Sequence, residues 1–487
     1  DMTSGCMAQI TSGNCDENGA EWSPCATRIA FVSNRSPDPD ATFSSNVYVV
    51  SATNSDRGRT LLQITDHAGC SVRALAWAPD GQTLAYTFSP RKPEVFWYAT
   101  THVALAASDG SDCRLTSSAK RGADRVLTWA LDRNVSQIRF AADGESIFAT
   151  IEDSGALQLC SISLGPMRIP TGSAAGGSNN DGVAAVEIVI GGEVAVESYE
   201  VSTGSAPTVV ALVSSPHLPA EAFLLESPGR CGDRELRQLT FVNDDVLSSV
   251  TLGAVHKVAI PCADVRDYTT LGNRSMHIDR VNQTVEMFVV LPPGVALTQD
   301  GTQQDGQRFP TILWCHGGPV AQFDYGFTEN AQLFASAGYV VLLVNPRGST
   351  GRGEEFCAAL YADWGGPARH DVLTAVDYAV DSLGLCDPRR LGVGGWSYGG
   401  ILTNYCITAD SRFKAAISGA SQFLFTAAYG HDQYQLYWEL EFGLPWENPQ
   451  GWDAISPFNR VRRATPRCIR GGDVCVCVCV CVCVCVC

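Results

Sequence analysis

The sequence predicts an all-β first half followed by an α/β second half. Between about Arg28 and Leu252, short runs of alternating apolar and polar residues are separated by turn dipeptides, which is typical of antiparallel strands. After Pro261, apolar runs alternate with segments that carry apolar residues at helical spacing, and this pattern favours a parallel sheet with crossover helices. At 487 residues, the chain is expected to form two or three domains.

The composition is that of an ordinary globular protein, with 45% hydrophobic and 17% charged residues. The formal net charge of −17 argues against nucleic acid and anionic lipid as partners, because the field of the protein repels phosphate groups. No apolar run approaches the roughly 20 residues that span a bilayer, and the first residues lack the features of a signal peptide. We therefore expect a soluble, cytoplasmic protein with no membrane partner and an undefined oligomeric state.

The 20 cysteines predict neither a zinc site nor a disulfide framework. Seven of them lie in the terminal run of alternating valine and cysteine, and the other thirteen show no CxxC pair and no cluster with histidines. Buried free thiols in a reducing compartment are the favoured interpretation. The chemistry predicted below requires no metal and no organic cofactor.

The first half contains a repeated hairpin pattern. In ALAWAPDGQTLAYTF, apolar alternation runs into and out of the turn Pro79-Asp80-Gly81, where glycine supplies the positive φ value that a tight hairpin needs. QIRFAADGESIFATI repeats this layout at Asp143-Gly144, 63 residues after Asp80, a spacing that fits one four-stranded blade with an insertion. A second repeated feature, the threonine marker, is the threonine at the end of LLQIT, CRLT and RQLT. These threonines are Thr65, Thr116 and Thr240.

These repeats, over roughly residues 28 to 262, resemble the TolB-like β-propeller that precedes the catalytic domain in the prolyl oligopeptidase family. About four blades are recognisable, whereas the propellers of that family are larger closed rings, so the chain is expected to begin inside the ring. An unrelated β-sandwich is the alternative. Residues 171 to 182 (TGSAAGGSNNDG) are expected to form a flexible polar loop.

In the second half, PTILWCHGG and YVVLLVNPRG predict strands that end in loops, and HDVLTAVDYAVDSLG predicts a helix. Leu391 to Gly394 then form a short strand, GWSYG (395 to 399) a turn, and Gly400 begins a helix, which is the order of a nucleophile elbow. The glycines leave room for a strained turn that presents Ser397 to substrate. Ser397 is therefore the candidate nucleophile.

HGGP, from His316 to Pro319, follows a strand at the point where this fold supplies its second oxyanion donor. We assign the backbone N–H of Tyr398 and the N–H of Gly317 or Gly318 to the oxyanion hole. The ring of His316 is expected to support this loop rather than to take part in catalysis.

HGGP, NPRGSTGRGEEF, DWGG followed by HDVLTAVDY, and GWSYGG together resemble the prolyl oligopeptidase family across residues 310 to 470. Features of the acylaminoacyl-peptidase and dipeptidyl-peptidase branches are both present. The resemblance implies a serine peptidase that hydrolyses short or N-terminally blocked peptides through an acyl-enzyme on Ser397. Arg347 and Arg352 could bind a substrate carboxylate, but structural salt bridges are the favoured interpretation.

The catalytic acid and base are not found. In this fold they follow the nucleophile, the acid before the histidine, but His431 is the only histidine after Ser397 and lies in an aromatic insertion of the wrong type. The neighbouring Asp432 matches a family position that has no catalytic role. The stretch SPFNRVRRATPRCIRGGD resembles the approach to the triad acid, but Arg467 and Arg470 interrupt what should be a buried strand.

At Val474 the chain enters seven Val-Cys pairs that look like a translated dinucleotide repeat. We therefore predict a C-terminal truncation, a bare sheet edge and an inactive chain as written. A thiolate array that binds metal is the alternative for the tail. The predicted domains are a partial β-propeller (1–262), an incomplete α/β-hydrolase with a mostly parallel sheet (263–473) and the tail (474–487). An esterase on the same fold and a catalytically dead propeller scaffold remain alternatives, and fewer than three blades would favour the esterase.

Overall fold

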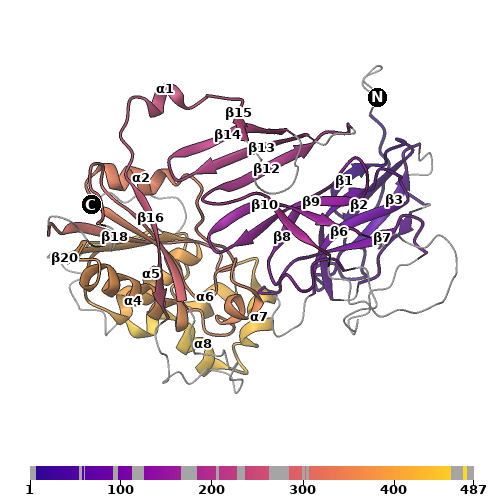
Figure 1. The fold of residues 1–487 in the computed structure, drawn as a ribbon. Coiled ribbons are helices and arrows are strands. Elements are labelled where there is room, and N and C mark those ends of the chain that lie inside the picture. The colour runs from indigo at the N-terminus through magenta and orange to yellow at the C-terminus, as the bar shows by residue number, and fades with distance from the viewer. Residues whose placement is uncertain are drawn as a thin grey trace. The chain divides into compact units, whose positions relative to one another are not determined.

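A computed structural model of the chain describes residues 7–53, 58–59, 61–67, 69–90, 97–111, 126–165, 184–204, 208–226, 236–262, 284–298, 302, 306–430, 432–461 and 475–479. The chain divides into two compact units (Figure 1). The first unit comprises residues 1–92, 99–214 and 220–241, and the second comprises 93–98, 215–219 and 242–487. The division after residue 241 differs from the predicted boundary at 262, because strand β16 (Val255–Pro261) pairs with β17 (Thr284–Val290) in the sheet of the second unit.

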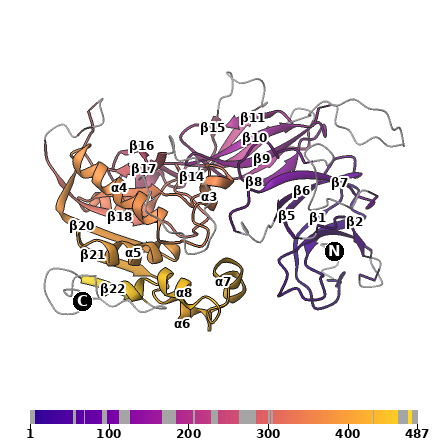
Figure 2. The same ribbon diagram turned by 90° about the horizontal axis from the view of Figure 1, so that it is seen from below.

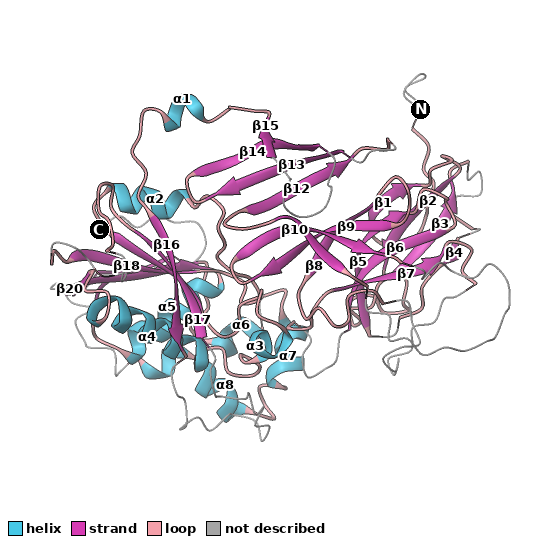
Figure 3. Ribbon diagram, viewed as in Figure 1, coloured by secondary structure: helices cyan, strands magenta, loops and turns pink. Residues whose placement is uncertain are grey.

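The first unit is built of antiparallel strands (Figure 3). Strands β1 to β4 form one sheet and β5 to β7 a second, while β8 to β15 form a third sheet whose two halves are joined by one parallel pairing of β10 with β12. The strands are β1 (Glu17–Trp22), β2 (Arg28–Ser33), β3 (Asn46–Ser51), β4 (Leu62–Gln63), β5 (Cys70–Trp77), β6 (Thr83–Pro90), β7 (His102–Ala107), β8 (Val135–Phe140), β9 (Ser146–Asp153), β10 (Ala156–Ser163), β11 (Val186–Ile190), β12 (Ala195–Val201), β13 (Thr208–Ser215), β14 (Leu218–Glu226) and β15 (Leu236–Gln238).

Apolar cores lie between successive groups of strands. One core joins β2 and β3 to β5 and β6, a second joins β5 and β6 to β8 through β10, and a third joins β9 and β10 to β12 and β13. Each group therefore buries its face against the next, as stacked blades do. The described strands make up four such groups but do not establish a closed ring, so the propeller remains a prediction.

The two Asp-Gly turns have the same geometry. Gly81 and Gly144 have φ values of 67° and 70° and lie between paired strands, as predicted. At the first turn, the Gly81 N–H donates to the carbonyl of Ala78 at 2.9 Å and the carboxylate of Asp80 accepts from the Gln82 N–H at 2.8 Å. In the second turn, the Gly144 N–H donates to the carbonyl of Ala141, and the carboxylate of Asp143 accepts from the Glu145 N–H.

The threonine marker also has a repeated structural role. The hydroxyl oxygens of Thr65 and Thr240 accept hydrogen bonds from the backbone N–H groups of Val47 and Ala222, at 2.9 and 2.8 Å. Thr116 lies outside the described residues. Thr128, which the sequence analysis missed, accepts from the N–H of Val103 at 2.9 Å in the same way. A threonine that follows one strand thus satisfies a backbone donor of its neighbour, which explains why the marker recurs.

The second unit contains a seven-stranded sheet in the order β16-β17-β19-β18-β20-β21-β22. The pairings of β16 with β17 and of β17 with β19 are antiparallel, and the other pairings are parallel, so the predicted mostly parallel sheet is confirmed. The remaining strands are β18 (Phe309–Cys315), β19 (Val340–Asn345), β20 (Cys386–Trp396), β21 (Phe413–Gly419) and β22 (Cys475–Cys479). All six residues of β19 are buried, as its continuous apolar run predicts.

Helices accompany this sheet (Figure 3). They are α1 (Asp244–Leu247), α2 (Glu329–Ser336), α3 (Glu354–Ala358), α4 (Pro367–Asp381), α5 (Tyr398–Ala409), α6 (Phe425–Tyr429), α7 (Gln435–Phe442), α8 (Pro449–Ile455) and the 3₁₀ helix η1 (Pro457–Arg460). The predicted apolar face of α4 is buried: Val372, Ala375, Val376, Ala379 and Val380. Among the helices in the described ranges, none combines the length and the apolar character that a membrane span requires.

Part of the Val-Cys run lies in the sheet. The backbone of β22 pairs in parallel with β21, from Ala415 opposite Cys475 to Gly419 opposite Cys479 (Figure 2). The edge of β21 is therefore covered, because an extended backbone can satisfy its exposed ladder groups, and β22 is the last strand of the sheet in the described part of the chain. Arg467 and Arg470 lie outside the described residues, as do positions 480–487.

The cysteines outside this run agree with the expectation of free thiols. Nine of them fall in the described part of the chain, and none of these nine forms a disulfide bond. Five are buried: Cys160, Cys315, Cys357, Cys386 and Cys406. These thiols act as small apolar side chains of the cores.

We expect Thr65→Val to lower the free energy of unfolding by about 1–3 kcal/mol, because it leaves the buried N–H of Val47 without its acceptor. Thr53→Val, at an exposed position, serves as the control and should change stability by less than about 0.5 kcal/mol. Urea denaturation of both variants measures the difference. Equal stability of the two variants would contradict the role given to the threonine marker.

Candidate active site

Ser397 lies at a sharp bend between β20 and α5. Its φ of 57° and ψ of −123° fall in a region that residues with a side chain rarely adopt. The Ser397 N–H donates to the carbonyl of Gly419 at the end of β21 over 3.0 Å, and the side chain is exposed. The strand, bend and helix occur in the predicted order, although β20 begins earlier, at Cys386, and α5 begins at Tyr398 rather than Gly400.

Three glycines allow this bend to pack against the ends of two other strands. A Cβ atom on Gly395 or Gly399 would lie 2.6 or 2.1 Å from the carbonyl oxygen of Cys315, at the end of β18. A Cβ atom on Gly400 would lie 2.5 Å from the carbonyl oxygen of Gly419. No real side chain tolerates such distances to backbone atoms, so the bend requires glycine at these positions.

The structure brings the HGGP loop to the candidate nucleophile. A Cβ atom built on Gly317 would lie 3.5 Å from the Cβ of Ser397 and 3.3 Å from the carbonyl oxygen of Trp396. Gly318 is exposed and has a φ of 120°, which favours glycine. The two predicted halves of the oxyanion hole, 80 positions apart in the sequence, are therefore neighbours in the fold.

Tyr398 is the first residue of α5, so its N–H has no acceptor within the helix. The positive end of the helix dipole lies at the same point, next to the serine hydroxyl. A negatively charged oxygen formed beside Ser397 would be favoured there.

The ring of His316 is held by its own loop. Nδ1 donates to the carbonyl of Gly317 at 2.6 Å, and Nε2 lies 3.0 Å from the hydroxyl oxygen of Ser349. The ring also contacts Phe323 edge to face, with the ring centroids 5.3 Å apart. Burial lowers the pKa of His316, so the ring is neutral near pH 7. The Ser349 hydroxyl donates to the carbonyl of Pro346 at 2.7 Å and so links the His316 ring to the loop after β19. This geometry agrees with the supporting role expected for His316.

Arg347 forms a buried ion pair rather than an open anion site. Its guanidinium donates to Asp371 of α4 through Nε at 2.8 Å and Nη2 at 2.6 Å, and its backbone N–H donates to the same carboxylate at 2.9 Å. Arg352 lies 3.9 Å from Glu286 and over the ring of Phe356, with its guanidinium carbon 5.2 Å from the ring centroid. The structural salt-bridge interpretation fits both arginines.

Within the described part of the chain, the hydroxyl of Ser397 has no hydrogen-bond partner that could act as a base. His431 lies outside the described residues. The carboxylate of Asp432 accepts from Gln422, Tyr434 and Trp438 at 2.6, 2.8 and 3.1 Å.

Sequence reasoning missed the buried residues Trp364 and Glu441, which hold Tyr398 next to the bend. The Tyr398 hydroxyl donates to the carbonyl of Trp364 at 2.9 Å, and the two rings meet edge to face with centroids 5.6 Å apart. The Trp364 indole N–H donates in turn to the buried carboxylate of Glu441 at 2.7 Å. The two glutamates inside the aromatic run QYQLYWELEF, Glu439 and Glu441, were the available signal, because a buried carboxylate needs several donors.

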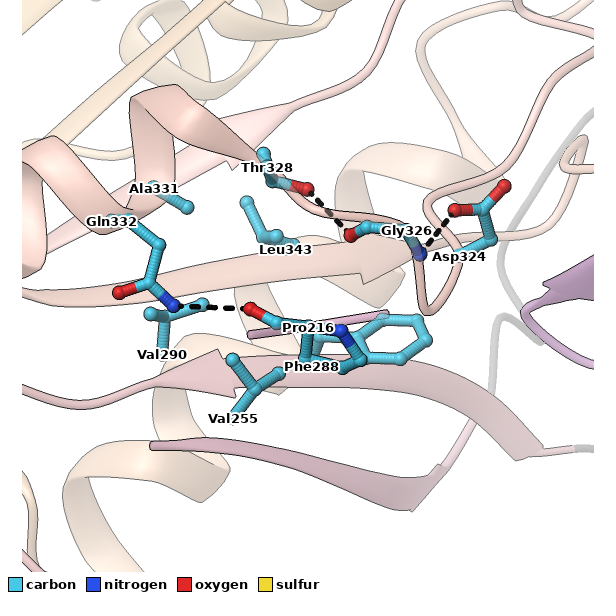
Figure 4. A pocket seen from close by; sticks show the side chains of 10 residues that line it. All are labelled: Pro216, Val255, Phe288, Val290, Asp324, Gly326, Thr328, Ala331, Gln332 and Leu343. Carbon is cyan, nitrogen blue, oxygen red and sulfur yellow. Dashed lines mark hydrogen bonds between the residues drawn. The ribbon is translucent and has the colours of Figure 1, made fainter. Parts of the chain in front are cut away.

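A small pocket in the described structure lies elsewhere (Figure 4). It is lined by Pro216, Val255, Phe288, Val290, Asp324, Gly326, Thr328, Ala331, Gln332 and Leu343. Its polar groups bond to one another, as in the contacts from Gln332 to Pro216 and from Gly326 to Asp324 (Figure 4). The space admits about one water molecule and touches neither Ser397 nor the HGGP loop, so it is not a substrate site.

Residues 325–474 match the model of the prolyl oligopeptidase family. The uncharacterized peptidase YuxL of Bacillus subtilis is 35% identical over 175 residues, which cover 35% of this chain and 27% of that protein. A probable dipeptidyl-peptidase 5 of Emericella nidulans is 33% identical over 198 residues, which cover 39% of this chain and 26% of that protein. The alignment with these curated relatives thus spans about a quarter of their length.

The fold is similar to solved structures over most of the chain. The acylaminoacyl peptidase of Pyrococcus horikoshii covers 92% of this chain with a TM-score of 0.56, at 17% identity and over 77% of its own length. Oligopeptidase B of Trypanosoma brucei covers 91% with a TM-score of 0.61, at 13% identity and over 55% of its own length. Ser397, at the bend before α5, lies within the matched residues 325–474, and the curated relatives are named as peptidases. The second half of this chain contains a domain of the prolyl oligopeptidase family.

Proposed function

We propose that this chain is a serine-type peptidase in which Ser397 forms an acyl-enzyme with short or N-terminally blocked peptides. The observation that carries the proposal is the exposed Ser397 at a strained bend, directly beside Gly317 and the N-terminus of α5. A strained, glycine-flanked serine between a strand and a helix suits nucleophilic attack on a carbonyl.

In the proposed reaction, Ser397 Oγ attacks the scissile carbonyl carbon and loses its proton to a base. The carbonyl oxygen becomes an oxyanion, for which the N–H groups of Tyr398 and of Gly317 or Gly318 are the proposed donors. The C–N bond then breaks, the amine leaves with the proton, and an ester to Ser397 remains. Water hydrolyses this ester by the same steps and frees the acid product.

The proposed substrate class rests on the resemblance and on the names of the relatives. Curated relatives are dipeptidyl-peptidases, and a similar structure is an acylaminoacyl peptidase bound to Z-Gly-Gly-Phe-chloromethyl ketone, a blocked peptide derivative. The four groups of strands in the first unit support a partial propeller in front of the catalytic domain, and they favour a peptidase over a simple esterase.

The proposed mechanism needs a histidine base held by an acid, and no described residue bonds to Ser397 Oγ in this way. We therefore propose that the triad acid and histidine are missing from the 487-residue chain and that it turns over little substrate alone. If a chain that is extended with the missing base also shows no activity, the alternative of a catalytically dead scaffold would replace the peptidase proposal.

A fluorophosphonate probe should label Ser397 at least about 100-fold faster in an extended chain than in the chain as it is, because a base activates the serine. In the extended chain, the residues after Arg460 are replaced by the corresponding segment of the Bacillus subtilis relative. Mass spectrometry identifies the labelled residue and gives the rate. Ser397→Ala should abolish labelling, whereas Ser336→Ala, on the exposed side of α2, should not. Labelling of another serine would refute the assignment.

Gly317→Ala should slow the labelling of Ser397 in the extended chain by at least about 10-fold, because the new methyl group enters the space of the oxyanion. The matched control is Gly392→Ala on β20, where the nearest atom to the new Cβ is 3.7 Å away. This variant should label within about 2-fold of the parent. Equal rates for both variants would remove Gly317 from the proposed site.

A further inference from the structure

The carboxylate of Glu441 gathers three hydrogen-bond donors on one oxygen. Glu441 lies on α7 and is 7% exposed. Its Oε1 accepts from the Tyr98 hydroxyl at 2.8 Å, the Trp364 indole N–H at 2.7 Å and the Ala362 backbone N–H at 2.9 Å. The donors come from segments far apart in the sequence, so this single oxygen fixes residues 97–98 and 362–364 to α7.

Hydrogen bonds through Trp364 connect Glu441 to Tyr398, beside the bend at Ser397. The carbonyl of Trp364 accepts from the Tyr398 hydroxyl at 2.9 Å, and Tyr398 follows Ser397 directly. Trp364 also packs edge to face against Trp438, with the ring centroids 5.1 Å apart. Next to it, a Cβ atom on Gly365 would lie 2.4 Å from the ring of Tyr405 on α5, so the loop cannot shift toward this helix. A movement of Trp364 would therefore reach Tyr398 and its N–H.

We propose that Glu441 is a positioning residue for acyl transfer at Ser397, acting through Trp364 on the orientation of Tyr398. The inference rests on the proposed function, because Tyr398 supplies one of the proposed oxyanion donors. An oxyanion donor contributes only when its N–H points at the developing charge, and a displacement of a fraction of an ångström weakens that hydrogen bond.

The acceptor oxygen, rather than the negative charge, carries this role. Oε2 of Glu441 is buried and has no partner in the described structure, so glutamine could make the same three contacts through its carbonyl oxygen. Glu441→Gln is therefore a conservative variant that keeps the acceptor and removes the titration. Glu441→Ala removes the acceptor and leaves three donors unsatisfied.

The titration of Glu441 offers an independent readout. Burial raises the pKa of Glu441 from 4.5 to about 7, against the three donors, which lower it. The ionisable groups on the surrounding elements include Tyr98 and Tyr405, whose pKa values are raised by burial and by Glu441, and also Cys357 and Asp363. The pKa of Asp363 is itself raised by burial. On α7 itself, Glu439 bonds to Tyr429 at 2.5 Å, away from Glu441. These neighbours are unchanged in Glu441→Gln.

As pH rises from about 4.5 to 7, the unfolded chain loses the Glu441 proton while the folded chain keeps it, so the wild type loses stability over this window. Glu441→Gln has no such proton. We expect the melting temperature of the wild type, relative to Glu441→Gln, to fall by at least about 3 °C between pH 5 and pH 7.5. Thermal denaturation of both proteins measures this difference. A difference that does not change with pH would show that Glu441 is not buried in the way described.

The deciding experiment compares Glu441→Ala, Glu441→Gln and the matched control Glu439→Ala. Hydrogen exchange of the 487-residue chain, followed by mass spectrometry, reports on peptides from 361–366 and 397–402. We expect at least about 10-fold faster exchange in both segments for Glu441→Ala, and rates within about 2-fold of the wild type for the other two variants. In the extended chain, the maximal rate of Ser397 labelling should fall for Glu441→Ala while the affinity for the probe stays unchanged.

The inference would be overturned if residues 397–402 exchange at the wild-type rate in Glu441→Ala. It would also be overturned if these residues exchange faster in Glu441→Gln than in the wild type. If Glu441→Ala does not fold, Trp364→Phe decides, because it removes the indole N–H donor to Glu441 and keeps a smaller aromatic ring at this position: faster exchange at 397–402 supports the inference, and unchanged exchange refutes it. An extended wild-type chain that is not labelled would refute the proposed function. The exchange result would still decide whether Glu441 holds the bend.

Discussion

The candidate site depends on the close approach of one bend to the ends of two strands. The bend at Ser397 fits between β18 and β21 because Gly395, Gly399 and Gly400 bring backbone next to backbone at distances that exclude any side chain. The strain at Ser397 persists because this packing and the hydrogen bond to Gly419 leave the residue no relaxed alternative. The same contact brings the end of β18, and with it Gly317, beside the serine.

Two buried polar groups hold the loops around this bend in place. Asp371 on α4 binds Arg347 through three hydrogen bonds and fixes the loop that follows β19. Glu441 on α7 binds Trp364 and fixes the loop that supports Tyr398. A buried carboxylate with several donors is costly to separate from them, so each pair restrains its loop firmly. The site is therefore assembled by loops whose positions are set from the helical layer.

Much of the fold could be predicted because its patterns are local. The alternation around Asp80-Gly81, the continuous apolar run of β19 and the apolar spacing on α4 each depend on the nearest residues in the chain. The strand that begins the second unit could not be predicted from such patterns, because β16 resembles the strands before it and is distinguished only by its partner, β17. Thr128, which has the same role, ends the segment RVLT, so its local sequence did carry the threonine marker.

The sequence by itself determined the order of strand, bend and helix around Ser397, the need for glycine there, and the two loops that could supply oxyanion donors. These features follow from the steric limits of a short segment. The tertiary structure alone decided that Gly317 lies against Ser397, that Arg347 is taken up by Asp371, and that Glu441 collects donors from Tyr98 and Trp364. These contacts join residues from 24 to 343 positions apart, arise from how the sheet and helices pack, and are encoded by no local pattern.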